Sequence, residues 1–191
     1  MRVIAGEARG HKLFAPDGLH TRPTADRVKE ALFSVLAPDI RGCAFLDLYS
    51  GSGAIGIEAL SRGAAWAVFV DEDHHSAACI QKNLEKTRMG HLGQVMTTPV
   101  SYTIASLARQ KASFDIIFMD PPYGGDHIEE TLKSLAQTPI LREGGLVIAE
   151  TAADQAVTFA SRYGFHLIKE KQYNIARLVF WQPDREGASK P

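Results

Sequence analysis

Apolar and polar positions follow a strand–helix alternation along most of this chain. Short, nearly continuous apolar runs are typical of strands buried on both faces, and the segments between them repeat apolar residues at helical spacing. The alternation predicts a parallel sheet covered by helices on both faces. The predicted series is strand 44–49, helix 54–62, strand 67–70, helix 74–87, strand 93–97, helix 104–110, strand 114–120, helix 128–136, strand 145–150 and helix 156–163.

The two ends of the chain depart from this alternation. Residues 165–174 and 175–182 are two strands with almost no turn between them, which predicts an antiparallel hairpin at the edge of the sheet. Near the start, residues 1–15 predict a β-hairpin that turns at its glycines. A helix is predicted over residues 24–36, with Thr24 as its N-cap.

Length and composition favour a single soluble domain. The chain has 191 residues, of which 45% are hydrophobic and 23% charged. It has no apolar run long enough for a membrane helix and no apolar stretch typical of a secretory signal, so we expect a cytoplasmic protein. The expected organisation is one domain over residues 1–181, made of an N-terminal hairpin and helix (1–40) and a core (41–181), with a flexible tail (182–191).

A glycine-rich turn joins the first strand of the series to the helix after it. In DLYSGSGAIGIEAL, residues 47–60, Gly51, Gly53 and Gly56 satisfy the pattern G-x-G-x-x-G. Glycines in such a turn let the backbone approach a ligand, and the helix N-terminus offers free N–H groups to an anionic group. A tight strand–helix turn without a ligand is the alternative, because the motif alone is weak.

A carboxylate ends the second strand of the series, 20 residues after Gly51. Asp71 can accept hydrogen bonds from both hydroxyls of a ribose, and the alternative is an acid that caps the following helix. Together, the two features favour a ligand that contains adenosine at the carboxyl edge of the sheet. They leave open whether this ligand is a nicotinamide cofactor or S-adenosylmethionine.

The stretch FDIIFMDPPYGG, residues 114–125, distinguishes between these cofactors. An exocyclic amine is a poor nucleophile because its lone pair is conjugated with the ring, and two acceptors on its N–H bonds free that lone pair. Asp120 and the carbonyl of Pro121 supply such acceptors, since Pro121 and Pro122 form a stiff loop without N–H donors. Tyr123 can stack on a base. These residues predict methyl transfer to an exocyclic amine; a rigid turn with a packed tyrosine is the alternative.

Motifs along the chain carry a resemblance to a known family. Asp-Pro-Pro-Tyr after such a glycine loop resembles the motif of amino-methyltransferases that act on adenine N6, cytosine N4 or guanine N2. RVIAGEARGHKL (2–13) and RPTADRVKEALFSVL (22–36) resemble the small-subunit (16S) rRNA guanine-N2 methyltransferase family, whose members modify guanine 966. The similarity spans residues 2 to about 181.

The resemblance implies a fold, a cofactor and site residues. The fold is α/β: a Rossmann-like class I methyltransferase with a seven-stranded, mostly parallel sheet of order 3-2-1-4-5-7-6. S-adenosyl-L-methionine is expected over the glycine loop, with Asp47 at its methionine end, Asp71 at its ribose and the N–H of Val100 at its adenine. The expected cofactor-binding residues are Asp47, Tyr49, Ser50, Gly51, Ser52, Gly53, Asp71, Glu72 and Val100. The expected catalytic residues are Asp120, Pro121, Pro122 and Tyr123.

The distribution of charge bears on the substrate. The whole chain has a net charge of −1, whereas residues 1–29 carry six basic side chains against three acidic ones, a net charge of +3. Cations in this segment can position RNA phosphates around an extruded base. The low net charge argues against tight binding to naked RNA, so we expect the substrate to be 16S rRNA in the 30S subunit or its assembly intermediate. We also expect the protein to be a monomer. The expected substrate-binding residues are Arg9, His11, Arg22, Thr24, Arg27 and Lys29.

Two other functions stay open on the sequence alone. An adenine-N6 methyltransferase acting on DNA or RNA would use the same Asp-Pro-Pro-Tyr loop, although the chain has no room for an added target-recognition region. A ribosome-assembly factor could bind RNA and cofactor without turnover. The histidines show no metal-binding spacing with one another or with Cys43 and Cys79, so no metal is expected.

Overall fold

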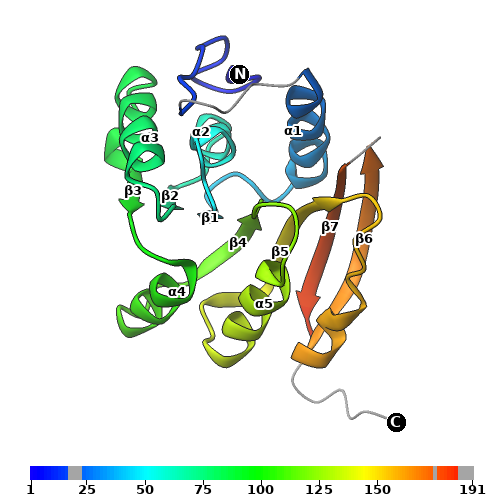
Figure 1. Ribbon diagram of the computed structural model, residues 1–191. Helices are drawn as coiled ribbons and strands as arrows, with labels where there is room; N and C mark the ends of the chain where they lie inside the picture. Colours follow the sequence, from blue (N-terminus) through cyan, green and yellow to red (C-terminus); the bar gives the residue numbers. More distant parts are fainter. Residues whose placement is uncertain (17–22, 174–175, 185–191) are drawn as a thin grey trace.

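The computed structural model describes residues 1–16, 23–173 and 176–184 of the chain. These residues form one seven-stranded sheet with helices on both of its faces (Figure 1). The strands are β1 (Ala44–Leu48), β2 (Trp66–Val70), β3 (Gly93–Met96), β4 (Phe114–Met119), β5 (Leu141–Ala152), β6 (Phe165–Tyr173) and β7 (Ala176–Pro183).

The strands lie in the order β3-β2-β1-β4-β5-β7-β6. Strands β1 to β5 run parallel, and β7 is antiparallel to both of its neighbours. The predicted fold class, strand order and reversed last strand are therefore confirmed.

Helices divide between the two faces of the sheet, as Figure 1 shows. One face carries α1 (Pro23–Leu36), α2 (Ala54–Ser61) and α3 (His74–Lys86), together with the N-terminal segment. The other face carries α4 (Val100–Arg109), α5 (His127–Gln137) and the 3-10 helix η2 (Thr158–Tyr163). A short 3-10 helix, η1 (Gly90–Leu92), leads into β3.

Two apolar cores lie on opposite faces of the central strands. Neighbouring residues of one strand point to opposite faces, so Phe45 packs in the core under α1 to α3 while Leu46 packs under α4 and α5. All five residues of β1 are buried. A parallel strand covered on both faces needs apolar side chains at successive positions, which explains the continuous apolar runs in the sequence.

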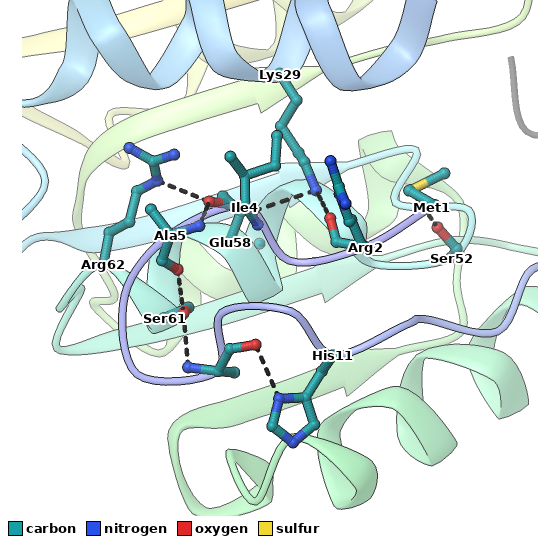
Figure 2. A network of polar contacts seen from close by, with 12 residues as sticks. Met1, Arg2, Ile4, Ala5, His11, Lys29, Ser52, Glu58, Ser61 and Arg62 are labelled. Atoms are coloured by element: carbon teal, nitrogen blue, oxygen red, sulfur yellow. Dashed lines mark hydrogen bonds and ion pairs between the residues drawn. The ribbon is translucent and has the colours of Figure 1, made fainter. Parts of the chain in front are cut away.

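The predicted N-terminal β-hairpin is reduced to a single antiparallel bridge between Arg2 and Lys12. Beside this bridge, the N–H of Val3 donates to the His11 carbonyl and the N–H of Gly10 donates to the Val3 carbonyl, both at 2.9 Å, and the segment also binds α2. The Glu58 carboxylate accepts hydrogen bonds from the N–H groups of Ile4 and Ala5, at 2.8 and 3.0 Å (Figure 2). The short hairpin is therefore held to α2 through the N–H groups of Ile4 and Ala5.

The close approach of this segment to α2 requires a glycine at position 6. Gly6 has a φ of +83°, and a Cβ atom there would lie 1.7 Å from the carbonyl oxygen of Ser61. The Ser61 hydroxyl donates to the Ala5 carbonyl at 2.6 Å and accepts from the Ala8 N–H at 3.0 Å. A side chain at position 6 would thus push the segment away from the helix.

Several element boundaries differ from the predicted ones. Helix α1 begins at Pro23, whose fixed φ suits the first helical position, so Thr24 lies within the first turn and is not the N-cap. Helix α4 begins at Val100, four residues before its predicted start, and Pro99 is its N-cap. The helix predicted over 156–163 is the short 3-10 helix η2. Strand β7 continues to Pro183, past the predicted start of the tail, whose residues 185–191 lie outside the described part of the chain.

None of the helices in the described residues combines the length and the apolar character needed to cross a bilayer.

Candidate active site

Polar residues gather at the edge of the sheet where β1, β2, β4 and β5 end. The register pairs Leu48 with Val70 and Met119, and Met119 with Ala149, so the residues that follow these strands share one edge. A cavity of about 880 Å³ opens there, within the range of small-molecule sites. The predicted site residues that line it are Lys29, Asp47, Tyr49, Ser50, Gly51, Ser52, Asp71, Glu72, Val100, Asp120, Pro121, Pro122 and Tyr123.

The glycine loop between β1 and α2 has a left-handed backbone conformation that residues other than glycine rarely adopt. Tyr49, Gly51 and Gly53 all have positive φ, at 61°, 54° and 74°. Tyr49 is the non-glycine residue in this set, and its hydroxyl is held by a hydrogen bond to the Thr131 hydroxyl on α5 at 3.0 Å. Gly53 is the N-cap of α2 and is buried behind the lining of the cavity.

Ser50 ties the loop to the neighbouring strand. Its hydroxyl donates to the Asp47 carbonyl at 2.6 Å and accepts from the Val70 N–H at 2.9 Å. Its own N–H donates to the Val70 carbonyl at 2.9 Å. The loop is thus preorganised by protein contacts before any ligand binds.

Asp47 lies buried under the loop, at 1% exposure. Its Oδ2 atom accepts a hydrogen bond from the Gly56 N–H at 2.9 Å. Gly56 also packs against the ring of Phe69, which a Cβ atom would approach to 2.3 Å. Burial raises the pKa of Asp47 to about 7, and the charge of Asp71 adds to this rise.

Asp71 follows β2 and hydrogen-bonds both to the glycine loop and to the turn before α3. Its carboxylate accepts from the Gly51 N–H at 2.8 Å and from the Asp73 N–H at 3.0 Å. The alternative role of Asp71 as a helix cap is wrong, because Asp73 caps α3 by accepting from the N–H groups of His75 and Ser76. Glu72 lines the cavity next to Asp71.

The Asp-Pro-Pro-Tyr loop follows β4 directly. Asp120 faces the cavity and is accessible from it, while Pro121 is buried. The side chain of Tyr123 is 57% exposed at the rim. Desolvation within the cavity holds the pKa of Asp120 well above its usual range, and the nearby charges of Glu150 and Asp47 raise it further.

Glu150, on β5, is a cavity residue that the sequence-based prediction missed. Its signal was present in the sequence, because Glu150 ends an apolar run as Asp71 and Asp120 do. Partial burial raises its pKa. The cavity therefore has acidic groups on four strand ends, counting Asp47 at the end of β1.

Asn83, on α3, was also missed and connects two parts of the site. It is fully buried, and its Nδ2 atom donates to the carbonyls of Ser52 at 2.9 Å and Phe14 at 3.0 Å. Its Oδ1 atom accepts from the Phe14 N–H at 2.8 Å. The glycine loop and the N-terminal segment are thereby held by one side chain.

The predicted RNA-binding residues are only partly brought together. Arg9, His11 and Arg27 are exposed and lie outside the lining of the cavity. Arg22 and the side chain of Thr24 lie outside the described part of the structure.

The side chain of Lys29 is buried, and its ammonium group binds other residues of the protein. It is 2% exposed, and its ammonium pairs with Glu58 at 3.2 Å and donates to the Arg2 carbonyl at 2.5 Å (Figure 2). Desolvation lowers its pKa, although Glu58 opposes this shift. The predicted phosphate contact of Lys29 is therefore wrong, because its charge is already committed inside the protein.

In the described residues, no three His, Cys, Asp or Glu side chains are placed to hold a metal ion together.

The sheet order, the glycine loop and the acid-rich strand ends define the fold of a Rossmann-like methyltransferase. Within that class the chain belongs to the family described as "Conserved hypothetical protein 95", whose model matches residues 1–182.

Named relatives match over nearly the whole chain. A putative rRNA methyltransferase, YlbH of Bacillus subtilis, is 35% identical over 173 residues, which cover 86% of this chain and 94% of the relative. Ribosomal RNA small subunit methyltransferase D of Escherichia coli K12 is 34% identical over 190 residues, 99% of this chain and 93% of the relative. The solved structure of putative methyltransferase yhhF from Escherichia coli superposes with a TM-score of 0.82 at 34% identity, covering 96% of this chain and 98% of that one.

Proposed function

We propose that the protein transfers a methyl group from S-adenosyl-L-methionine to the exocyclic N2 amine of a guanine in 16S rRNA, of the guanine-966 type. The observation that carries this proposal is one shared cavity. It brings the acid-Pro-Pro-Tyr loop after β4 to the same sheet edge as the glycine loop after β1 and the acid after β2.

The charges and hydrogen-bonding groups of the cavity lining suit S-adenosylmethionine. This cofactor supplies an activated methyl group and carries positive charges on its sulfonium and its amine. Asp47 lies under the glycine loop, where a carboxylate complements the amine of the methionine end. Asp71 and Glu72 lie at the end of β2, where they can accept hydrogen bonds from the ribose hydroxyls. Val100 is the first residue of α4, and its N–H is assigned to the adenine.

The residues after β4 act on the amine of the base. The Asp120 carboxylate accepts one N–H of the amine, so that the lone pair is directed away from the ring, and it takes the proton that the nitrogen releases. The Pro121 carbonyl accepts the second N–H. Pro122 stiffens the loop, and Tyr123, exposed at the rim, stacks on the extruded base.

The RNA substrate is inferred from the relatives and from the exposed cations. Relatives covering most of the chain are named rRNA methyltransferases, including small subunit methyltransferase D. Exposed Arg9 and Arg27 supply positive charge for phosphates, and exposed His11 offers a ring N–H donor. The substrate is the 30S subunit or its assembly intermediate, and the protein acts there as a monomer in the cytoplasm, with residues 1–40 facing the RNA.

Transfer of labelled methyl groups tests this function. The protein is incubated with labelled S-adenosylmethionine and small subunits that lack their 16S methyl groups, and the labelled nucleoside is then identified. We expect N2-methylguanosine at one position of 16S rRNA. Label on N6-methyladenosine would support the adenine enzyme, and absence of label would support a silent assembly factor; either result would refute the proposal.

A further inference from the structure

Glu150 lies beside Asp120 at the edge of the sheet. Strands β4 and β5 are parallel neighbours that pair Met119 with Ala149, so the next residue of each strand is one of the two acids. Both acids line the cavity. The charge of Glu150 contributes to the high pKa of Asp120, in agreement with this placement.

The protein supplies little to neutralise this pair. In the described part of the chain, no ion pair involves Asp120 or Glu150, and Lys29, the lysine in the cavity lining, pairs with Glu58. Burial is the cause that raises the pKa of Glu150. Two carboxyl groups that face a cavity without a cationic partner are costly unless a ligand supplies N–H donors or positive charge.

The pattern of donors on guanine matches such a pair. The Watson–Crick edge of guanine presents the N1–H donor next to the N2 amine, so two neighbouring acceptors can bind both. Adenine presents an unprotonated N1 next to its N6 amine, and a carboxylate facing that nitrogen would be repelled. An acid beside Asp120 therefore suits guanine and opposes adenine.

We propose that Glu150 is the residue that makes the site specific for guanine, by accepting the N1–H hydrogen bond while Asp120 accepts from N2. This inference rests on the proposed function, since it concerns the base that is methylated. It extends that function by assigning base selection to strand β5 and not to the Asp-Pro-Pro-Tyr loop.

2-Aminopurine provides the test, because it keeps the 2-amino group of guanine and lacks the N1–H. Small subunits are reconstituted with either guanine or 2-aminopurine at the methylated position, and kcat/KM is measured for each. For the wild type we expect guanine to be preferred roughly 10- to 100-fold, the range for one hydrogen bond to a charged group. For Glu150→Gln we expect this preference to fall about tenfold, because the amide can accept from guanine N1–H or donate to the bare N1 of 2-aminopurine.

Two controls separate base selection from general damage. Glu130→Gln removes another carboxylate from the lining of the same cavity, on α5, and should leave the preference for guanine at the wild-type level. Binding of S-adenosylmethionine to Glu150→Gln, measured by calorimetry, should match the wild type, since Glu150 is assigned to the base.

The inference is overturned if wild type and Glu150→Gln show the same preference for guanine, even if Glu150→Gln has a lower kcat/KM on both guanine and 2-aminopurine. It is also overturned if the wild type methylates 2-aminopurine as fast as guanine. Failure of the proposed function looks different, because the wild type itself would then place its methyl group on another base or on none.

Discussion

At the scale of single residues, the buried carboxyl group of Asp47 has a raised pKa that binding of a cationic group would lower. Asp47 is buried and accepts a hydrogen bond from the backbone N–H of Gly56, and its pKa is raised to about 7 mainly by desolvation. Ionising it in the free protein therefore costs free energy, which a cationic group of the cofactor would recover. The site thus binds best when its occupant carries positive charge.

Replacing Asp47 by Asn should change how stability depends on pH. A carboxyl whose pKa is higher in the folded protein than in the unfolded chain causes no penalty below about pH 4. The penalty develops as pH rises towards 7 and is complete above it. Asp47→Asn should therefore gain stability over the wild type between pH 4 and 8, by a few kcal/mol at most, since each pKa unit is worth about 1.4 kcal/mol.

Urea unfolding of the cofactor-free protein at several pH values measures this effect. Asp73→Asn is the control, because helix N–H groups lower the pKa of Asp73 and its charge favours folding. A difference between Asp47→Asn and the wild type that stays constant from pH 4 to 8 would contradict the assigned environment of Asp47.

At the scale of elements, residues 1–14 form a belt that is hydrogen-bonded to three helices, α1, α2 and α3. Glu58 on α2 accepts from Ile4 and Ala5 and pairs with Lys29 on α1 and with Arg62 at 2.8 Å (Figure 2). On the other side, Asn83 on α3 binds the segment at Phe14. The belt therefore spans the helices that flank the glycine loop.

Asn83→Ala should weaken both the fold and the cofactor site. It leaves the N–H of Phe14 and the carbonyls of Phe14 and Ser52 without their partner. We expect a loss of roughly 2–4 kcal/mol in the free energy of unfolding, together with weaker binding of S-adenosylmethionine. Gln81→Ala, an exposed position on the same helix, should stay within about 0.5 kcal/mol of the wild type. Equal stability of the two variants would show that the Asn83 contacts contribute nothing.

The sheet could be predicted from the sequence, whereas the contacts of the belt could not. Apolar periodicity is a local signal, so it predicted the sheet, and strand ends pointed to Asp47, Asp71 and Asp120. The belt depends on hydrogen bonds such as Ile4 to Glu58, across 54 residues of sequence, which no local pattern encodes. For the same reason Lys29 was assigned to RNA, although it pairs inside the protein with Glu58.

At the scale of the whole molecule, the charge limits how RNA can be bound. The net charge is −1, so attraction to phosphates comes from local cations such as Arg9 and Arg27 and is weak overall. The cavity itself is acidic. We therefore expect recognition to depend largely on the shape of a folded particle.

Assembled particles should therefore be better substrates than free RNA. We expect kcat/KM for small subunits or their assembly intermediates to exceed that for protein-free 16S rRNA by at least about tenfold at physiological salt. Initial rates of labelled methyl transfer to the two substrates, at matched RNA concentration, measure the difference. Equal rates would mean that the RNA alone carries the recognition.

The measurement that tests the central claim most directly separates turnover from cofactor binding in Asp120→Ala. Asp120 is assigned to the amine of the base, whereas the glycine loop and Asp71 are assigned to the cofactor. We predict that Asp120→Ala lowers kcat by at least about 100-fold while its Kd for S-adenosylmethionine stays within about threefold of the wild type. Asp126→Ala, an exposed acid just before α5, should keep normal turnover. Wild-type turnover in Asp120→Ala, or loss of cofactor binding in step with turnover, would contradict the account.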